Sequence, residues 1–143
     1  MTARSGPAYG DDIKVRGPPW EGRILMLEPG GIFAGRYRVV RNIASGGVGS
    51  VYEVVHLETE RRRALKVMHP DIAADPALAR RFEQEARVGA RIKSEHVVEV
   101  IAAGVDEATK LPWLVMELLE GEPLRARIDA AGHLGAGEIR TIF

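Results

Sequence analysis

The chain has 143 residues, enough for one domain of ordinary size, and its 45% hydrophobic and 28% charged residues are typical of a globular protein. Twenty basic residues balance twenty acidic residues, which argues against a nucleic-acid or membrane-surface protein held by bulk charge. The absence of cysteine excludes disulfide bonds, thiolate metal sites and cysteine nucleophiles.

The N-terminal part, residues 1–35, is predicted to be a flexible lead because it holds seven of the sixteen glycines and four of the eight prolines. Within it, the apolar run at residues 24–27 is expected either to pack on the domain or to add an edge strand. Ordered structure is expected to begin near Arg36. No apolar run approaches the ~20 residues of a transmembrane helix and no signal-peptide pattern follows Met1, so we expect a cytoplasmic protein.

A glycine-rich stretch lies between two segments, residues 37–43 and 51–57, whose β-branched and aromatic residues predict strands. The stretch carries three glycines, Gly46, Gly47 and Gly49. The turn is longer than a tight two-residue hairpin needs, and a loop without bulky side chains lets backbone N–H groups approach a phosphate. On its own, the stretch is compatible with a plain hairpin and with a phosphate-binding loop.

A third strand is predicted at residues 61–68, bounded by Pro70. Because side chains alternate along a strand, Ala64 and Lys66 share one face of it with Met68. The lysine therefore lies on the same side of the strand as a small apolar residue.

The strongest helix signal follows at Asp75-Pro76, where the aspartate caps a helix that is expected to run to about Lys93. Its apolar stripe is predicted to use Leu78, Phe82, Gly89 and Ile92. Glu85 falls within that stripe. Its carboxylate therefore either points at the protein, where burial requires a cationic partner, or reaches solvent from the edge of the stripe.

Two more strands are predicted at residues 97–104 and 113–119, joined by a polar hairpin loop at 106–112. A short helix is expected near Pro123 and another near residue 137. The order of elements predicts an α+β fold, with a five-stranded antiparallel sheet covered by one helix and followed by two short helices.

Several nucleotide and metal motifs are excluded by pattern. A P-loop needs a Gly-Lys dipeptide, which the chain lacks, and a dinucleotide-binding turn must lead into a helix where this sequence predicts a strand. The histidines are scattered without metal-ligand spacing, at His56, His69, His96 and His133.

One combination of motifs is not excluded by these patterns. The glycine-rich loop is followed by Lys66 on an Ala-Leu-Lys strand, by Glu85 on the next helix, and by a hydrophobic strand that ends at Met116-Glu117 before Gly121. In this order and spacing, the motifs resemble the N-terminal lobe of the eukaryotic-type protein kinases. The loop is most similar to that of bacterial serine/threonine kinases, which often reads Gly-Gly-Met-Gly-x-Val-Tyr where this chain has Gly-Gly-Val-Gly-Ser-Val-Tyr.

The resemblance covers about residues 36–143 and implies a domain organisation. Residues 36–120 would form the N-terminal lobe, with the glycine-rich loop, the lysine strand, the glutamate helix and the hinge. Residues 121–143 would be the truncated start of the C-terminal lobe.

The resemblance also implies an ATP site. Its residues would be Ile43, Ala44, Ser45, Gly46, Gly47, Val48, Gly49, Val51, Ala64, Lys66, Met116, Glu117 and Leu119. Lys66 would hold the α- and β-phosphates, and Glu85 would pair with Lys66 to fix it. Met116 would be the gatekeeper at the back of the pocket, and the backbone of Glu117 and Leu119 would bond the adenine edge.

Val51 and Ala64 would pack on the adenine, with Ile43 at the edge of that pocket. One departure from the family pattern lies in the loop itself, because Ala44 replaces the first glycine. Alanine tolerates fewer backbone conformations, so we expect a stiffer loop that still binds.

The larger departure is the absence of the family's catalytic and metal-binding motifs. His-Arg-Asp with an asparagine five residues after the aspartate, and Asp-Phe-Gly, do not occur; the single asparagine is Asn42. The sequence therefore contains neither the catalytic base nor the Mg²⁺ ligands of the family, and no metal site is predicted. We expect weak or absent ATP binding and no turnover from this chain alone.

For the full-length parent, the resemblance implies transfer of the ATP γ-phosphoryl group to Ser or Thr hydroxyls of a protein substrate, with Mg²⁺. No nucleic-acid partner and no membrane segment are expected. A non-catalytic interaction or regulatory module is the alternative, and a retained Lys66–Glu85 pair speaks against it. A third reading, a small α+β domain unrelated to kinases, predicts a structure without a cleft beside residues 46–49.

Overall fold

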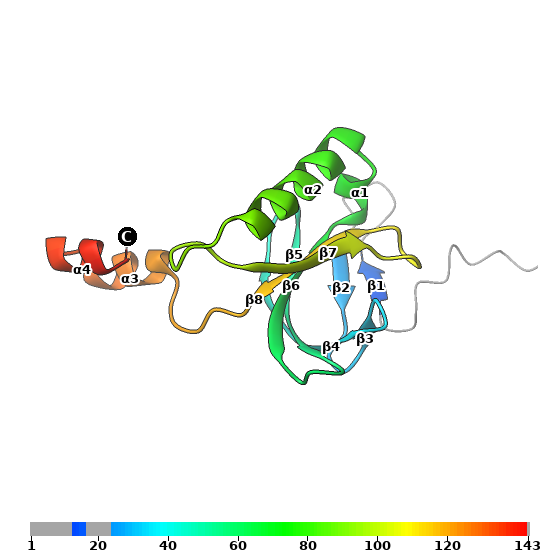
Figure 1. Cartoon of the computed structure of the whole chain (residues 1–143), viewed down its shortest axis with the longest axis horizontal. Coiled ribbons are helices and arrows are strands. Elements are labelled where there is room, and N and C mark those ends of the chain that lie inside the picture. The colour runs from blue at the N-terminus through cyan, green and yellow to red at the C-terminus, as the bar shows by residue number, and fades with distance from the viewer. Residues whose placement is uncertain (1–12, 17–23, 143) are drawn as a thin grey trace, which may run out of the picture.

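The computed structural model describes residues 13–16 and 24–142. The elements in chain order are β1 (Ile13–Arg16), β2 (Ile24–Leu27), β3 (Ile32–Phe33), β4 (Tyr37–Ser45), β5 (Gly49–His56), β6 (Arg62–Met68), α1 (Pro70–Ala73), α2 (Pro76–Arg91), β7 (Val100–Val105), β8 (Pro112–Glu117), α3 (Leu124–Ala131) and α4 (Ala136–Ile142) (Figure 1). Most of the predicted lead, residues 1–12 and 17–23, lies outside the described residues.

The main sheet has six antiparallel strands in the order β3-β4-β5-β6-β8-β7. Helix α2 lies across this sheet, whereas α3 and α4 lie to one side of it (Figure 1). The predicted α+β fold with an antiparallel sheet and one packed helix is confirmed. The short strand β3 adds a sixth member that the sequence did not signal, and residues 24–27 pair with β1 in a separate two-stranded sheet.

The core lies on the face of the sheet where three aromatic rings meet. Trp113 contacts Phe33 and Tyr37 in edge-to-face geometry, with ring centroids 6.3 and 5.9 Å apart. Phe33 and Leu27 are only 1% and 5% exposed, so the prediction that ordered structure begins near Arg36 is wrong. The nearby glycines serve turns there: Gly30 and Gly35, for instance, adopt left-handed φ values of 88° and 65°.

Helix α2 starts as predicted. The Asp75 side chain accepts hydrogen bonds from the backbone N–H groups of Ala77 and Leu78 at 2.9 and 3.4 Å. The buried residues of α2 are Phe82 and Ala86, and they pack with Met68 and Leu114.

The predicted apolar stripe of α2 needs one correction, since it passes through Ala86 and not through Glu85. Adjacent helical residues differ by about 100° in direction, and Glu85 is exposed to solvent. Ile92, the predicted end of the stripe, is exposed as well. Gly89 faces strand β7 so closely that a Cβ there would lie 2.5 Å from Val100 Cγ2, which lets the helix approach the sheet.

The β5–β6 and β7–β8 loops have the same construction. In each loop, the N–H of the first residue, His56 or Asp106, donates to the carbonyl five positions later at 3.0 Å. The fifth residue, Glu60 or Lys110, adopts a left-handed φ of 55° or 60°. The side chain of the first residue accepts hydrogen bonds from backbone N–H groups within its loop. These side-chain bonds satisfy turn amides that the strands cannot reach.

The two predicted C-terminal helices are present as α3 and α4. Helix α3 ends at Gly132, whose φ of 75° makes it a left-handed cap, and none of the α3 residues is buried. Arg127 joins the two helices through an ion pair with Glu138 at 2.6 Å and also contacts Glu122 at 3.2 Å. Within residues 13–16 and 24–142, no helix has the length and apolar character that crossing a bilayer requires.

Candidate functional site

The glycine-rich loop, residues 44–49, is the tip of the β4–β5 hairpin. It is closed by a hydrogen bond from the Gly46 N–H to the Gly49 carbonyl at 3.0 Å. A Cβ at Gly49 would lie 2.3 Å from the Val67 carbonyl oxygen, so only glycine fits against strand β6. Gly47 has open space around it, and its N–H donates no hydrogen bond within the described chain. The loop is therefore packed at its base and open at its tip.

A hollow of about 330 Å³ lies beneath this loop. Its lining consists of Ala44, Ser45, Gly46, Gly47, Val48, Gly49, Val51 and Lys66. All eight residues belong to the predicted ATP site. The hollow contradicts the third reading of the sequence, which required a structure without a cleft beside residues 46–49.

Strand register explains why Lys66 joins the loop residues. Val51 pairs with Lys66 across β5 and β6, and Ala44 pairs with Val51 across β4 and β5. Directly paired residues project to the same face of a sheet, so these three side chains form one row. Two residues along β6, Ala64 pairs with Met116 in the next row of the same face. The predicted shared face of Ala64 and Lys66 is thus confirmed.

Other predicted residues lie outside the hollow. Ile43 sits at a register shift between Asn42 and Ala44 and is 41% exposed. Leu119 is exposed on the segment after β8, and the Glu117 N–H donates to the Glu99 carbonyl at 3.0 Å. Their roles at an adenine edge stay predictions.

Lys66 and Glu85 do not form an ion pair within the described part of the chain. The half-buried Lys66 places its ammonium over the ring of Phe82, 5.7 Å from the centroid, in a cation–π contact. Glu85 faces solvent because Ala86 and Phe82 occupy the packed face of α2. The structure therefore brings the lysine to the loop but not the glutamate to the lysine.

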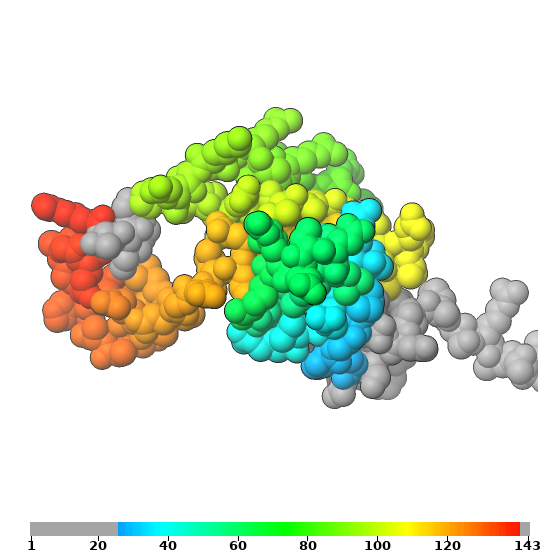
Figure 2. Space-filling view, turned by 60° about the horizontal axis from the view of Figure 1, so that its bottom comes forward, coloured from blue at the N-terminus to red at the C-terminus, as the bar shows by residue number. Residues whose placement is uncertain are grey.

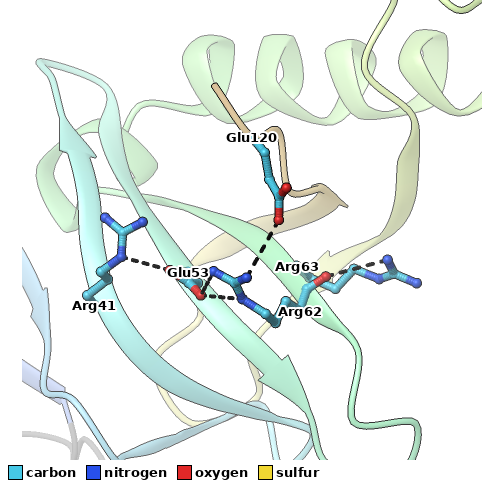
Figure 3. A network of polar contacts seen from close by, with 5 residues as sticks. All are labelled: Arg41, Glu53, Arg62, Arg63 and Glu120. Carbon is cyan, nitrogen blue, oxygen red and sulfur yellow. Dashed lines mark hydrogen bonds and ion pairs between the residues drawn. The ribbon is translucent and has the colours of Figure 1, made fainter. Parts of the chain in front are cut away.

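An ion-pair network on the same face of the sheet was not predicted from the sequence (Figure 3). Glu53, only 3% exposed, contacts Arg41 at 2.7 Å and Arg62 at 2.6 Å. Arg62 also reaches Glu120, on the segment that follows β8, at 3.7 Å. The signal in the sequence was an acidic residue between the apolar neighbours of β5, flanked by arginine-bearing strands.

Two opposing effects act on the Glu53 carboxyl. Burial alone would raise its pKa, but hydrogen bonds and charge from Arg62 and Arg41 outweigh burial and hold the pKa below its ordinary value. Glu53 is therefore an anion in the folded protein near neutral pH. It is the acceptor that fixes two guanidinium groups on the face of the sheet that carries Lys66.

The donors in the hollow fit a phosphate group better than a metal ion. Backbone N–H groups at the tip and the Lys66 ammonium offer positive charge to an anion. In the part of the chain that the structure describes, no three histidine, aspartate or glutamate side chains lie together as a metal site would require. The lining of the hollow also contains no carboxylate side chain, the usual protein ligand of Mg²⁺, so the residues of the hollow itself do not suit that ion.

A second hollow, of about 340 Å³, lies between α2 and β7. It contains none of the predicted ATP-site residues. Its floor includes Trp113, whose buried Nε1 has no hydrogen-bond partner among the described residues.

Comparison with known proteins agrees with this geometry. A family model described as the protein kinase domain matches residues 37–143. The probable serine/threonine-protein kinase pknA2 of Bifidobacterium longum is 40% identical over 114 residues, covering 78% of this chain and 15% of that protein. The serine/threonine-protein kinase PknA of Mycobacterium tuberculosis is 38% identical over 104 residues, covering 71% of this chain and 24% of that protein.

A solved structure is similar as well. The kinase domain of Mycobacterium tuberculosis PknI superposes with a TM-score of 0.68 at 33% identity, covering 81% of this chain and 46% of that one. This chain thus spans about a quarter or less of the two curated relatives and about half of the solved domain.

Proposed function

Since this chain belongs to the protein kinase family, we propose that its glycine-rich loop and Lys66 form the ATP phosphate site of a protein serine/threonine kinase. The observation that carries the proposal is the hollow that joins residues 44–49, Val51 and Lys66. The curated relatives named as serine/threonine-protein kinases support the choice of hydroxyl acceptor. For the whole protein we likewise propose protein serine/threonine kinase activity.

The chemistry would be transfer of the ATP γ-phosphoryl group to a Ser or Thr hydroxyl of a protein substrate. The part that this chain contributes is electrostatic positioning. The Gly47 N–H and the Lys66 ammonium would bind phosphate oxygens, while Val51 and Ala64 offer apolar surface to the adenine. No catalytic base or Mg²⁺ ligand is assigned in this sequence, so binding and not turnover is the activity to test.

The alternative is a non-catalytic interaction module that keeps the kinase-like lobe as a scaffold. The missing Lys66–Glu85 ion pair favours it, because the family's phosphate-binding arrangement needs that pair. A scaffold has no need for a cation in the hollow, so replacing Lys66 separates the two functions.

The test is an NMR titration of the ¹⁵N-labelled chain with ATP, comparing wild type, Lys66→Met and the matched control Lys93→Met at an exposed position. We expect amide shifts at residues 44–49 with millimolar affinity, loss of those shifts in Lys66→Met, and their retention in Lys93→Met. Identical titrations of all three proteins, or no loop shifts in any of them, would favour the scaffold. Phosphate transfer by the purified chain would overturn the expectation of binding without turnover.

A further inference from the structure

His69 lies directly beyond the end of β6 and is 5% exposed. It contacts the glycine-rich loop twice. Its backbone N–H donates to the Val48 carbonyl at 2.9 Å, and its ring Nε2 lies 2.9 Å from the Gly46 carbonyl oxygen. One residue therefore holds both sides of the loop tip, although the sequence showed it only as one of four scattered histidines.

The chemistry of this contact fixes which ring nitrogen must carry a proton. A carbonyl oxygen can only accept, so Nε2 must carry the proton and donate it. A neutral ring satisfies this requirement in one of its two tautomers, and a protonated ring also satisfies it because both nitrogens then carry hydrogen.

The contact also directs the next peptide group. In a trans peptide, the carbonyl and the following N–H point in opposite directions. By holding the Gly46 carbonyl, His69 turns the Gly47 N–H away from itself, and that N–H donates no hydrogen bond within the described chain. The tether therefore leaves a donor at the loop tip available for an external acceptor.

The base of the loop is fixed by a second set of polar contacts. The Asn42 side-chain amide donates to the Ser45 hydroxyl at 3.2 Å, and the Ser45 and Ser50 hydroxyls lie 3.1 Å apart. These bonds tie the β4 arm to the β5 arm but do not reach residues 46–48. Among the described side chains, His69 alone hydrogen-bonds the tip.

We propose that His69 is a positioning residue that orders the tip of the glycine-rich loop for phosphate binding, acting through its Nε2–H bond to Gly46. The identity of the ligand rests on the proposed function, whereas the tether itself rests on geometry. A donor held in place before binding spares the ligand the cost of ordering a loop rich in glycine.

The first test uses the wild-type chain at neutral pH without nucleotide. Ring ¹⁵N shifts in a long-range ¹⁵N–¹H NMR spectrum identify the tautomer of His69. We expect the Nε2–H form with a slowly exchanging ring proton. A ring with bare Nε2 and protonated Nδ1 would overturn the tether, because the Gly46 carbonyl cannot supply the missing proton.

The second test compares His69→Leu, which removes the side-chain donor at similar volume, with His69→Gln, which keeps an amide donor; both retain the backbone N–H bond to Val48. Hydrogen exchange of the Gly46 amide, which donates to the Gly49 carbonyl, should become about fivefold to tenfold faster in His69→Leu, as expected for one lost hydrogen bond, and should recover in His69→Gln. Unchanged exchange rates of the amides in β5, β6 and β8 would show that the fold is intact. Equal loop exchange in wild type and a folded His69→Leu would overturn the proposal.

An ATP titration separates the tether from the proposed function. If ATP binds, we expect affinity to fall by about fivefold in His69→Leu and to recover in His69→Gln. If wild type binds no ATP while the tautomer and exchange results hold, the proposed function fails and the ordered tip remains. If ATP binds equally to wild type and to a folded His69→Leu, the positioning role is overturned while the ATP site stands.

Discussion

The sheet with α2 and the α3–α4 segment are stabilised in different ways, although both carry many apolar residues. In the sheet, side chains such as Val54 and Leu65 are completely buried. In α3 no residue is buried, and its defined contacts are exposed ion pairs, namely Arg125 with Asp129 and Arg127 with its two carboxylate partners. Figure 2 shows α3 and α4, in orange to red, set off to one side of the sheet.

The comparison bears on function because all the residues that line the hollow beneath the glycine-rich loop belong to the sheet and its β4–β5 hairpin. Lys66, Val51 and the glycine-rich loop are carried by strands whose other face is the main core. The hollow therefore depends on hydrophobic burial, which salt does not screen, and not on the exposed ion pairs of α3–α4, which salt screens.

The largest expected effect is that of Phe82→Ala, which removes the buried ring between α2 and the sheet. It should lower the free energy of unfolding by about 3–5 kcal/mol, the usual cost of deleting a buried aromatic side chain. The matched change Ile128→Ala on α3 should cost less than about 1 kcal/mol, since no α3 residue is buried. Urea unfolding followed by circular dichroism measures both. Equal losses would show that α3 belongs to the same packed unit as the sheet.

Gly49→Ala tests whether tight packing of the sheet extends to the base of the loop. The new Cβ would collide with the Val67 carbonyl, and because a backbone atom cannot move aside cheaply, the cost should be about 1–3 kcal/mol. Gly46→Ala introduces its Cβ into open space and should change stability by less than about 0.5 kcal/mol. Thermal unfolding of the two variants provides the measurement, and a neutral Gly49→Ala would mean that β5 and β6 can separate locally.

Glu53→Ala tests the buried ion pairs of the sheet against the exposed ones of the helical segment. Removing Glu53 leaves two guanidinium groups without their shared acceptor, which should cost about 1–2 kcal/mol because both arginines are half-exposed. Glu138→Ala, which removes the exposed partner of Arg127, should leave the unfolding of the sheet unchanged. A chemical denaturation curve for each variant measures its free energy of unfolding. A larger loss of stability in Glu138→Ala than in Glu53→Ala would contradict the comparison.

The smallest expected effect is the pH dependence that Glu53 contributes. Its pKa is lower in the folded than in the unfolded chain, so unfolding takes up protons at acid pH and stability rises with pH in that range. The stability difference between wild type and Glu53→Gln should therefore be constant above about pH 4.5 and shrink as pH falls below that value. Denaturation at several pH values between neutral and acid measures it. A difference that grows on acidification would show that burial dominates the pKa.

Sequence patterns predicted the elements that depend on local signals. The strands of the sheet and the start of α2 follow from alternation and from an aspartate–proline cap, and both are present. The face of α2 was harder to assign, because a stripe through Phe82 and Gly89 is compatible with either residue 85 or residue 86. The small Ala86 gave too weak an apolar signal to decide between them.

Contacts that depend on register could not be predicted. Glu53 and Arg62 are nine residues apart along the chain, and His69 and Gly46 are 23 apart. Each pair meets only because β5 and β6 align with one particular register, which a single sequence does not specify. The Lys66–Glu85 pairing came from resemblance and not from periodicity, and the structure shows the two residues without that contact.

The β5–β6 and β7–β8 loops share one backbone construction, although they lie at opposite ends of the strands. Residues 57–60 read Leu-Glu-Thr-Glu and residues 107–110 read Glu-Ala-Thr-Lys, each with threonine in the third position and a left-handed fourth residue. Because the flanking backbone bonds are the same, we expect either tetrapeptide to fit either loop. Exchanging them would move two negative charges from one end of the sheet to the other while every strand keeps its register.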